Sequence, residues 1–165
     1  MAGNIINNST ELSFALEHIA QVAMEKVSED SLKRLKMLIM MYTYTWDYYP
    51  NKYYYNGKKT PTFQFREAFA WDGIKTSFQT APKTIENTLV YDWRSMKFDP
   101  VTFLHGSFKY GDMRENLAEL LNVSGVAEGG IGQKERGPYW DVFIDEMFSG
   151  NGAWSLDSLF SKYLK

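Results

Sequence analysis

The feature that most constrains this chain is a run from Asn4 to Tyr49 that contains neither proline nor glycine. Apolar side chains recur along it at intervals of three and four residues: Leu12, Leu16, Ile19, Ala23, Val27, Leu32, Leu35, Leu38, Ile39, Tyr42 and Trp46. This spacing predicts an amphipathic helix. Asn8 and Glu11 are three residues apart and predict its cap, because their side chains can bind free backbone N–H groups.

A polar interruption divides this run at Ser28–Ser31, where serines flank two acidic residues. Serine is a good N-cap, and acidic residues favour the first turn of a helix. One long helix and two helices in line therefore fit the sequence equally well. Pro50 and Asn51 are predicted to end the helical segment.

Tyrosine is concentrated just before and after that break. Seven of the chain's eleven tyrosines lie between Tyr42 and Tyr55. Each ring has a large area to bury and a hydroxyl group that needs a partner. So many cannot all be core residues, and we expect some to lie beneath a neighbouring segment or a neighbouring chain.

The rest of the sequence predicts a mixture of strands and helices. A short helix is expected over Phe63–Trp71, ending at Gly73, followed by alternating strand patterns at 74–80 and 84–91. Further helices are expected after Asp112, after Pro138 and over Ser155–Leu164. The fold class is thus α+β, with a small antiparallel sheet and two to three C-terminal helices. Residues 1–9 are expected to form a flexible arm and residues 10–165 a single domain.

Composition narrows the functional classes. A net charge of −2 and a pI of about 5.7 argue against a protein that mainly grips the nucleic-acid backbone. The chain has no cysteine, which excludes disulfides and thiol chemistry. We see no signal peptide, and no apolar run approaches the length of about 20 residues needed to span a bilayer. The expectation is a soluble protein of the cytoplasm or of a particle.

For each motif that could indicate catalysis or metal binding, a structural role explains the residues better. His105-Gly106-Ser107 lacks the Gly-x-Ser-x-Gly context of a nucleophile, and a loop histidine that binds backbone explains it better. The glycine-rich segment Gly125–Gly137 lacks the Gly-Lys-Ser/Thr of a phosphate loop. Asp141 and Asp145 are more typical of a solvated helix face. We therefore expect no catalytic residue, no metal and no cofactor.

Basic residues interleave with the tyrosines, at Lys52, Lys58, Lys59 and Arg66. This pattern is also found on surfaces that bind single-stranded nucleic acid. A protein–protein patch is the commoner explanation, because Tyr, Trp and Arg dominate interface cores. Nucleic-acid binding by an accessory protein of a phage or mobile element stays as the alternative hypothesis, and a helical interaction module as a third.

Several short motifs occur in an order that resembles the tail-completion or neck proteins of tailed bacteriophages. They are Tyr55–Thr60 followed by Phe63–Trp71, then Leu89–Asp92 with Met96, His105–Ser107, Asp112–Arg114, and Gly137–Trp140 with Phe143. The resemblance covers roughly residues 10–150, and departs from the family where Lys59 replaces an arginine. It implies helices packed on a curved antiparallel sheet. It implies no enzymatic activity, and a ring, usually six- or twelve-fold, that bridges the head connector and the tail tube.

The leading hypothesis is therefore a virion structural protein of the head–tail neck, made in the host cytoplasm, with DNA only passing through and no membrane contact. Its expected partners are other copies of itself, a portal or connector protein and a tail protein. The residues expected at interfaces are Tyr53, Tyr54, Tyr55, Lys59, Arg66, Glu128 and Arg136. His105 and Arg114 are expected to brace a loop against a helix start.

Overall fold

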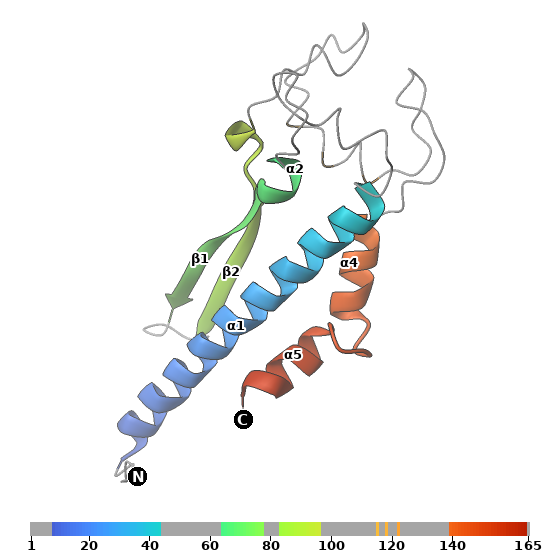
Figure 1. Cartoon of the computed structure of the whole chain (residues 1–165). Coiled ribbons are helices and arrows are strands. Elements are labelled where there is room, and N and C mark those ends of the chain that lie inside the picture. Colours follow the sequence, from blue (N-terminus) through green and yellow to red (C-terminus); the bar gives the residue numbers. More distant parts are fainter. Residues whose placement is uncertain are drawn as a thin grey trace, which may run out of the picture.

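The computed structural model describes residues 8–43, 64–77, 83–96, 115, 118, 122 and 139–164. Its elements, in chain order, are α1 (Ser9–Thr43), α2 (Gln64–Glu67), β1 (Phe69–Ser77), β2 (Thr84–Tyr91), the 3-10 helix η3 (Trp93–Ser95), α4 (Tyr139–Phe148) and α5 (Leu156–Tyr163). In Figure 1, α1 runs through the middle, with the sheet on one side and α4 and α5 on the other. A long helix, a two-stranded antiparallel sheet and C-terminal helices confirm the predicted α+β class.

Helix α1 begins as its sequence predicts. The Asn8 Oδ1 atom accepts a hydrogen bond of 2.8 Å from the backbone N–H of Glu11. The helix then continues through Ser28–Ser31 without a break, so the run forms one helix rather than two in line. The predicted boundary between arm and domain, at residues 9 and 10, falls in the first turn of α1.

The predicted helix over Phe63–Trp71 is wrong in its second half. The helix α2 ends at Glu67, and Phe69 begins β1. Phe69 pairs with Tyr91 at the end of β2, and the two rings stack with centroids 4.9 Å apart. Gly73 does not stop a helix but lies at a register shift in β1, with a φ of +102° that glycine adopts readily. Pairing with a distant strand has thus overridden a local pattern.

The second strand and the last helix agree with their predictions. β2 covers Thr84–Tyr91. The Ser155 side chain caps α5, accepting a hydrogen bond of 3.3 Å from the backbone N–H of Ser158. The sequence leaves Asp92–Met96 open between a strand end and a further short strand, whereas in the structure Trp93–Ser95 forms η3.

The core lies where α1 meets the sheet, α2 and α4. Its buried members are Val27, Leu35, Leu38, Ile39, Phe65, Ala68, Phe69, Met96, Tyr139, Phe143, Met147 and Leu159. Phe65 is the aromatic centre, with its ring edge-on to Phe69 at 5.4 Å and to Tyr139 at 5.9 Å. Such edge-to-face pairs add about 0.5–1.5 kcal/mol each to the effect of burial. All these core members lie at or after Val27, so the first part of α1 contributes none of them.

Candidate interaction surface

One face of α1 changes its surroundings along its length. Leu12, Leu16, Ile19, Ala23 and Val27 follow one another at intervals of three and four residues, so they share a helical face. From Ala23 onward that face is buried, with Ala23 at 0% and Val27 at 3% exposure. Of the described elements, the C-terminal helices α4 and α5 do not extend to the first turns of α1 (Figure 1).

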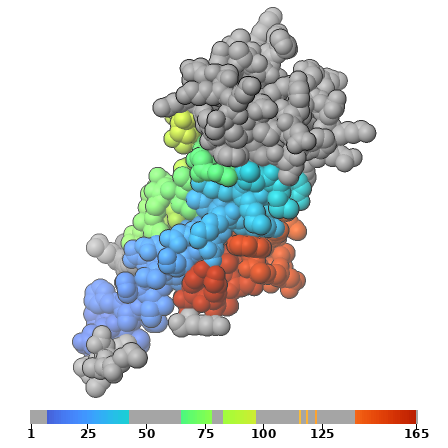
Figure 2. All heavy atoms as spheres, in the orientation of Figure 1, coloured from blue at the N-terminus to red at the C-terminus, as the bar shows by residue number. Residues whose placement is uncertain are grey.

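Before Ala23 the same face is open. Leu12, Leu16 and Ile19 are 45%, 56% and 47% exposed, and Val22 beside them is 40% exposed. We call these four residues the uncovered stripe. In Figure 2 the blue end of α1 extends past the red C-terminal helices. Exposed apolar residues at helical spacing, continuous with a core face, are typical of a surface that another protein covers.

The first part of α1 is held in place on a different side. The Lys83 ammonium, just before β2, forms an ion pair with Glu17 and donates a hydrogen bond of 2.7 Å to the Ser13 hydroxyl. The Lys83 contact lowers the pKa of Glu17 below its ordinary value. The uncovered stripe therefore lies on a helix that the sheet fixes, rather than on a free end.

The polar interruption at Ser28 is a contact with the sheet. The Trp71 indole N–H donates a 2.6 Å hydrogen bond to the Ser28 carbonyl, and the Asn87 amide donates one of 2.8 Å to the Ser28 hydroxyl oxygen. Ser31 donates a third, of 3.0 Å, to the same carbonyl. Ser28 is only 5% exposed. The carbonyl and the hydroxyl of Ser28 thus accept hydrogen bonds from both strands and join them to α1. The apolar pattern of the sequence alone could not indicate this contact.

Asp30 fastens α1 to the C-terminal helix. The Tyr163 hydroxyl donates a 2.5 Å hydrogen bond to Asp30 Oδ2, and the Lys162 ammonium lies 2.9 Å from the same atom. These contacts, led by the Tyr163 hydrogen bond, lower the pKa of Asp30 to about 2. They lie close to the end of α5, so they fix that end of α5 against α1.

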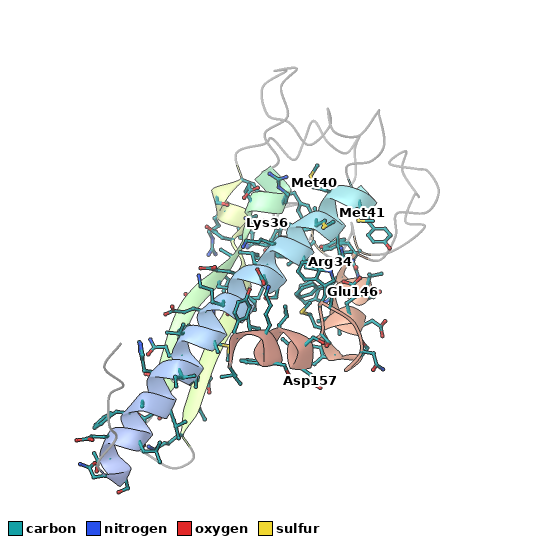
Figure 3. The ribbon with its side chains drawn as sticks, turned by 60° about the horizontal axis from the view of Figure 1, so that its bottom comes forward. Arg34, Lys36, Met40, Met41, Glu146 and Asp157 are labelled. Atoms are coloured by element: carbon teal, nitrogen blue, oxygen red, sulfur yellow. The ribbon has the colours of Figure 1, made fainter. Side chains whose placement is uncertain are left out.

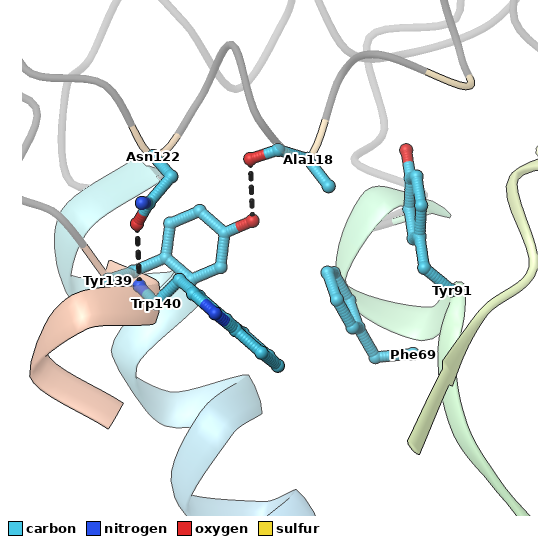
Figure 4. A pocket seen from close by; sticks show the side chains of 6 residues that line it. All are labelled: Phe69, Tyr91, Ala118, Asn122, Tyr139 and Trp140. Carbon is cyan, nitrogen blue, oxygen red and sulfur yellow. Dashed lines mark hydrogen bonds between the residues drawn. The ribbon is translucent and has the colours of Figure 1, made fainter. Parts of the chain in front are cut away.

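A pocket of about 340 Å³ lies where the sheet meets the start of α4. Its lining residues are Phe69, Tyr91, Ala118, Asn122, Tyr139 and Trp140. Figure 4 shows the four aromatic side chains of the wall together with Ala118 and Asn122. Phe69 and Tyr91 come together here because they are paired at the same end of the sheet.

The polar groups of the pocket wall bind one another. The Tyr139 hydroxyl donates a 2.9 Å hydrogen bond to the Ala118 carbonyl, and the Trp140 backbone N–H donates one of 2.8 Å to Asn122 Oδ1. The Asn122 amide lies 3.3 Å from Asp141 Oδ1. Burial raises the pKa of Tyr139 far above its ordinary value, so the phenol stays neutral. The surface that remains exposed in the pocket is mainly apolar.

Of the interface residues predicted from the sequence, only Arg66 lies among those described. Its guanidinium binds the neighbouring Glu67 at 2.6 Å, and Glu67 also binds Lys36 of α1 at 2.6 Å. Arg66 therefore joins a cluster that fastens α2 to α1, and its interface role stays a prediction. The other predicted residues lie outside the described part of the chain: Tyr53, Tyr54, Tyr55, Lys59, Glu128, Arg136, His105 and Arg114.

Among the described residues, no group of three or more His, Asp or Glu side chains could hold a metal ion, and none of the helices has the length and apolar composition of a membrane crossing. No protein-family model, curated protein or solved structure gave a significant match to the chain. The resemblance to phage neck proteins therefore stays a prediction from the order of motifs.

Proposed function

We propose that this chain is a non-catalytic structural subunit that works by assembling with other protein chains. The observation that carries the proposal is the uncovered stripe on α1, which continues a core face and lies on a helix braced by Lys83. Within this class we favour a ring-forming neck or tail-completion protein of a tailed bacteriophage, located in the virion between the head connector and the tail. That finer assignment rests on the order of motifs in the sequence.

The occupant of the uncovered stripe in this proposal is a second copy of the chain. Full burial of a half-exposed Leu or Ile contributes about 1 kcal/mol. Four such side chains, packed on an equal apolar area of a different surface of the next copy, contribute roughly 8 kcal/mol, which is comparable to the association cost of about 4–15 kcal/mol. One such contact supports only weak pairing. Stripe-to-stripe pairing would give a two-fold dimer, whereas a contact between the stripe and a different surface can close into a ring in which each subunit has two neighbours, so the proposed contact is of the second kind.

Adjacent positions on α1 offer a matched test. Ile19→Asp places a carboxylate in the stripe, whereas His18→Asp places one at an adjacent exposed position outside the stripe. The mass of each variant is measured by sedimentation velocity at several concentrations, with electron micrographs of any large species. We expect Ile19→Asp to abolish large species and His18→Asp to retain them. A wild-type protein that stays monomeric at every concentration tested would contradict the proposal.

A further inference from the structure

We propose that the aromatic pocket between the sheet and α4 binds an uncharged aromatic group of about two fused rings. This binding site is separate from the uncovered stripe, because it is lined by β1, β2, α4 and the residues Ala118 and Asn122, and no residue of α1 lines it. The proposal therefore does not depend on how the chain assembles.

The size of the group follows from the volume of the pocket. An apolar cavity of about 150 Å³ inside a protein is large enough to bind benzene. The pocket here has a volume of about 340 Å³, roughly twice that. It also falls within the range of about 300–1,000 Å³ that is usual for small-molecule sites. A bicyclic group such as an indole therefore suits the pocket better in size than a single ring.

The chemistry of the group follows from the walls. Among the described residues that line the pocket, four of six are aromatic and none carries a charge. Phe69 and Tyr91 are stacked at 4.9 Å, and because Phe69 is only 4% exposed, the sheet side of the pocket offers mainly the half-buried Tyr91 ring. The Tyr139 hydroxyl and Asn122 Oδ1 are engaged in the wall itself. A ring can stack or meet these rings edge-on, whereas a charged group would lose water and gain no opposite charge from the lining.

The test measures the binding of indole to the full chain by ligand-observed NMR. We expect saturable binding of indole, and at least tenfold weaker binding of indole-3-carboxylate. Ala118→Trp fills the pocket and should reduce indole affinity at least tenfold. Ala70→Trp is the matched control, because Ala70 is an exposed neighbour of Phe69 that does not line the pocket. It should bind indole as the wild type does.

Trp140→Leu gives a second way to test the wall if Ala118→Trp does not fold. It removes one ring but keeps the backbone N–H that binds Asn122, and should weaken indole binding several-fold. The proposal is overturned if binding does not saturate, if the carboxylate binds as tightly as indole, or if Trp140→Leu binds with unchanged affinity. The proposed ligand is a free small molecule, so saturating indole should leave the mass of the wild type unchanged. Loss of large species on addition of indole would overturn the proposal, because the pocket would then hold a side chain from another copy.

Discussion

Arg34 and Glu146 form a two-bond contact that joins α1 to α4. The Arg34 Nε atom donates a 2.7 Å hydrogen bond to Glu146 Oε2, and a terminal nitrogen donates one of 2.5 Å to Oε1. Figure 3 shows the two side chains meeting from their separate helices. The guanidinium also lies over the Trp154 ring, 5.4 Å from its centroid. One arginine thus connects the long helix to α4 and to the segment before α5.

Loss of the Glu146 carboxylate should destabilise the fold. Arg34 is 14% exposed and Glu146 27%, so the pair is only partly screened by water. Glu146→Ala leaves the guanidinium without its two acceptors, and we expect a loss of about 1–3 kcal/mol in the free energy of unfolding. Urea denaturation measures it. Glu29→Ala serves as the control, because the Lys26–Glu29 pair is about half exposed and should change stability by less than about 1 kcal/mol. Equal effects of the two substitutions would contradict this assignment.

The lowered pKa of Asp30 predicts that the folded protein loses stability in acid. Its pKa is about 2 in the folded protein, below the ordinary value of 3.8, because the Tyr163 hydroxyl and Lys162 bind the carboxylate. A lowered pKa in the folded state contributes stability above pH 4, which is lost as the pH falls from about 4 to 2. Lys162 is largely exposed, so solvent screening limits the contribution to about 1 kcal/mol.

The measurement is the urea midpoint between pH 6 and pH 2 for the wild type and Asp30→Asn. The variant should start lower and lose less stability across the acid range, and Tyr163→Phe should give an intermediate curve. Parallel curves for all three proteins would show that Asp30 does not carry this pH dependence.

Ser28 and Asn87 should be energetically coupled. Ser28→Ala removes the oxygen that accepts from the Asn87 amide, while the Trp71 bond to the Ser28 carbonyl remains possible. Asn87 Oδ1 is buried and has no hydrogen-bond partner among the described residues, so Ser28→Ala would leave the part-buried side-chain amide without the hydrogen bond that it makes here. We expect Ser28→Ala to cost about 1–2 kcal/mol. A double-mutant cycle with Asn87→Ala should give a coupling energy of about 1 kcal/mol, and strict additivity would exclude the contact.

Gly73→Ala tests the irregularity in β1. The φ of +102° at Gly73 is one that residues with a side chain rarely adopt, although no neighbouring atom crowds the position. The expected cost is therefore backbone strain, about 1–3 kcal/mol. Thr76→Ala, at an exposed position of the same strand, should cost less than about 1 kcal/mol. Thermal unfolding of both variants compares them, and equal costs would mean that Gly73 is not constrained.

The sequence predicted the parts of the fold that depend on local spacing. The absence of proline and glycine and the cap at Asn8 predicted α1, and the alternation over 84–91 predicted β2. The spacing of Phe65 and Phe69 fits one face of a helix, but Phe69 lies in a strand because it pairs with Tyr91. That pairing joins residues far apart in the chain, so a local pattern cannot reveal it.

The candidate surfaces depended still more on tertiary structure. Leu12, Leu16 and Ile19 have the same periodicity as the buried Ala23 and Val27. They differ only because the covering helices do not reach them, and no spacing within α1 records that. The pocket combines residues from four separated parts of the chain, so its lining could not be read from any one motif. Of the predicted interface, only Arg66 lies among the described residues.

The most direct test of the central claim uses the absence of cysteine from the chain. A single cysteine at Ile19→Cys or at His18→Cys would give one thiol to label, on adjacent residues of α1. The labelling rate is measured across a range of protein concentrations. The account predicts that labelling at position 19 slows as concentration rises and copies cover the stripe, while labelling at position 18 stays constant. Equal, concentration-independent rates at both positions, in samples that contain large species, would show that the chain assembles through another surface.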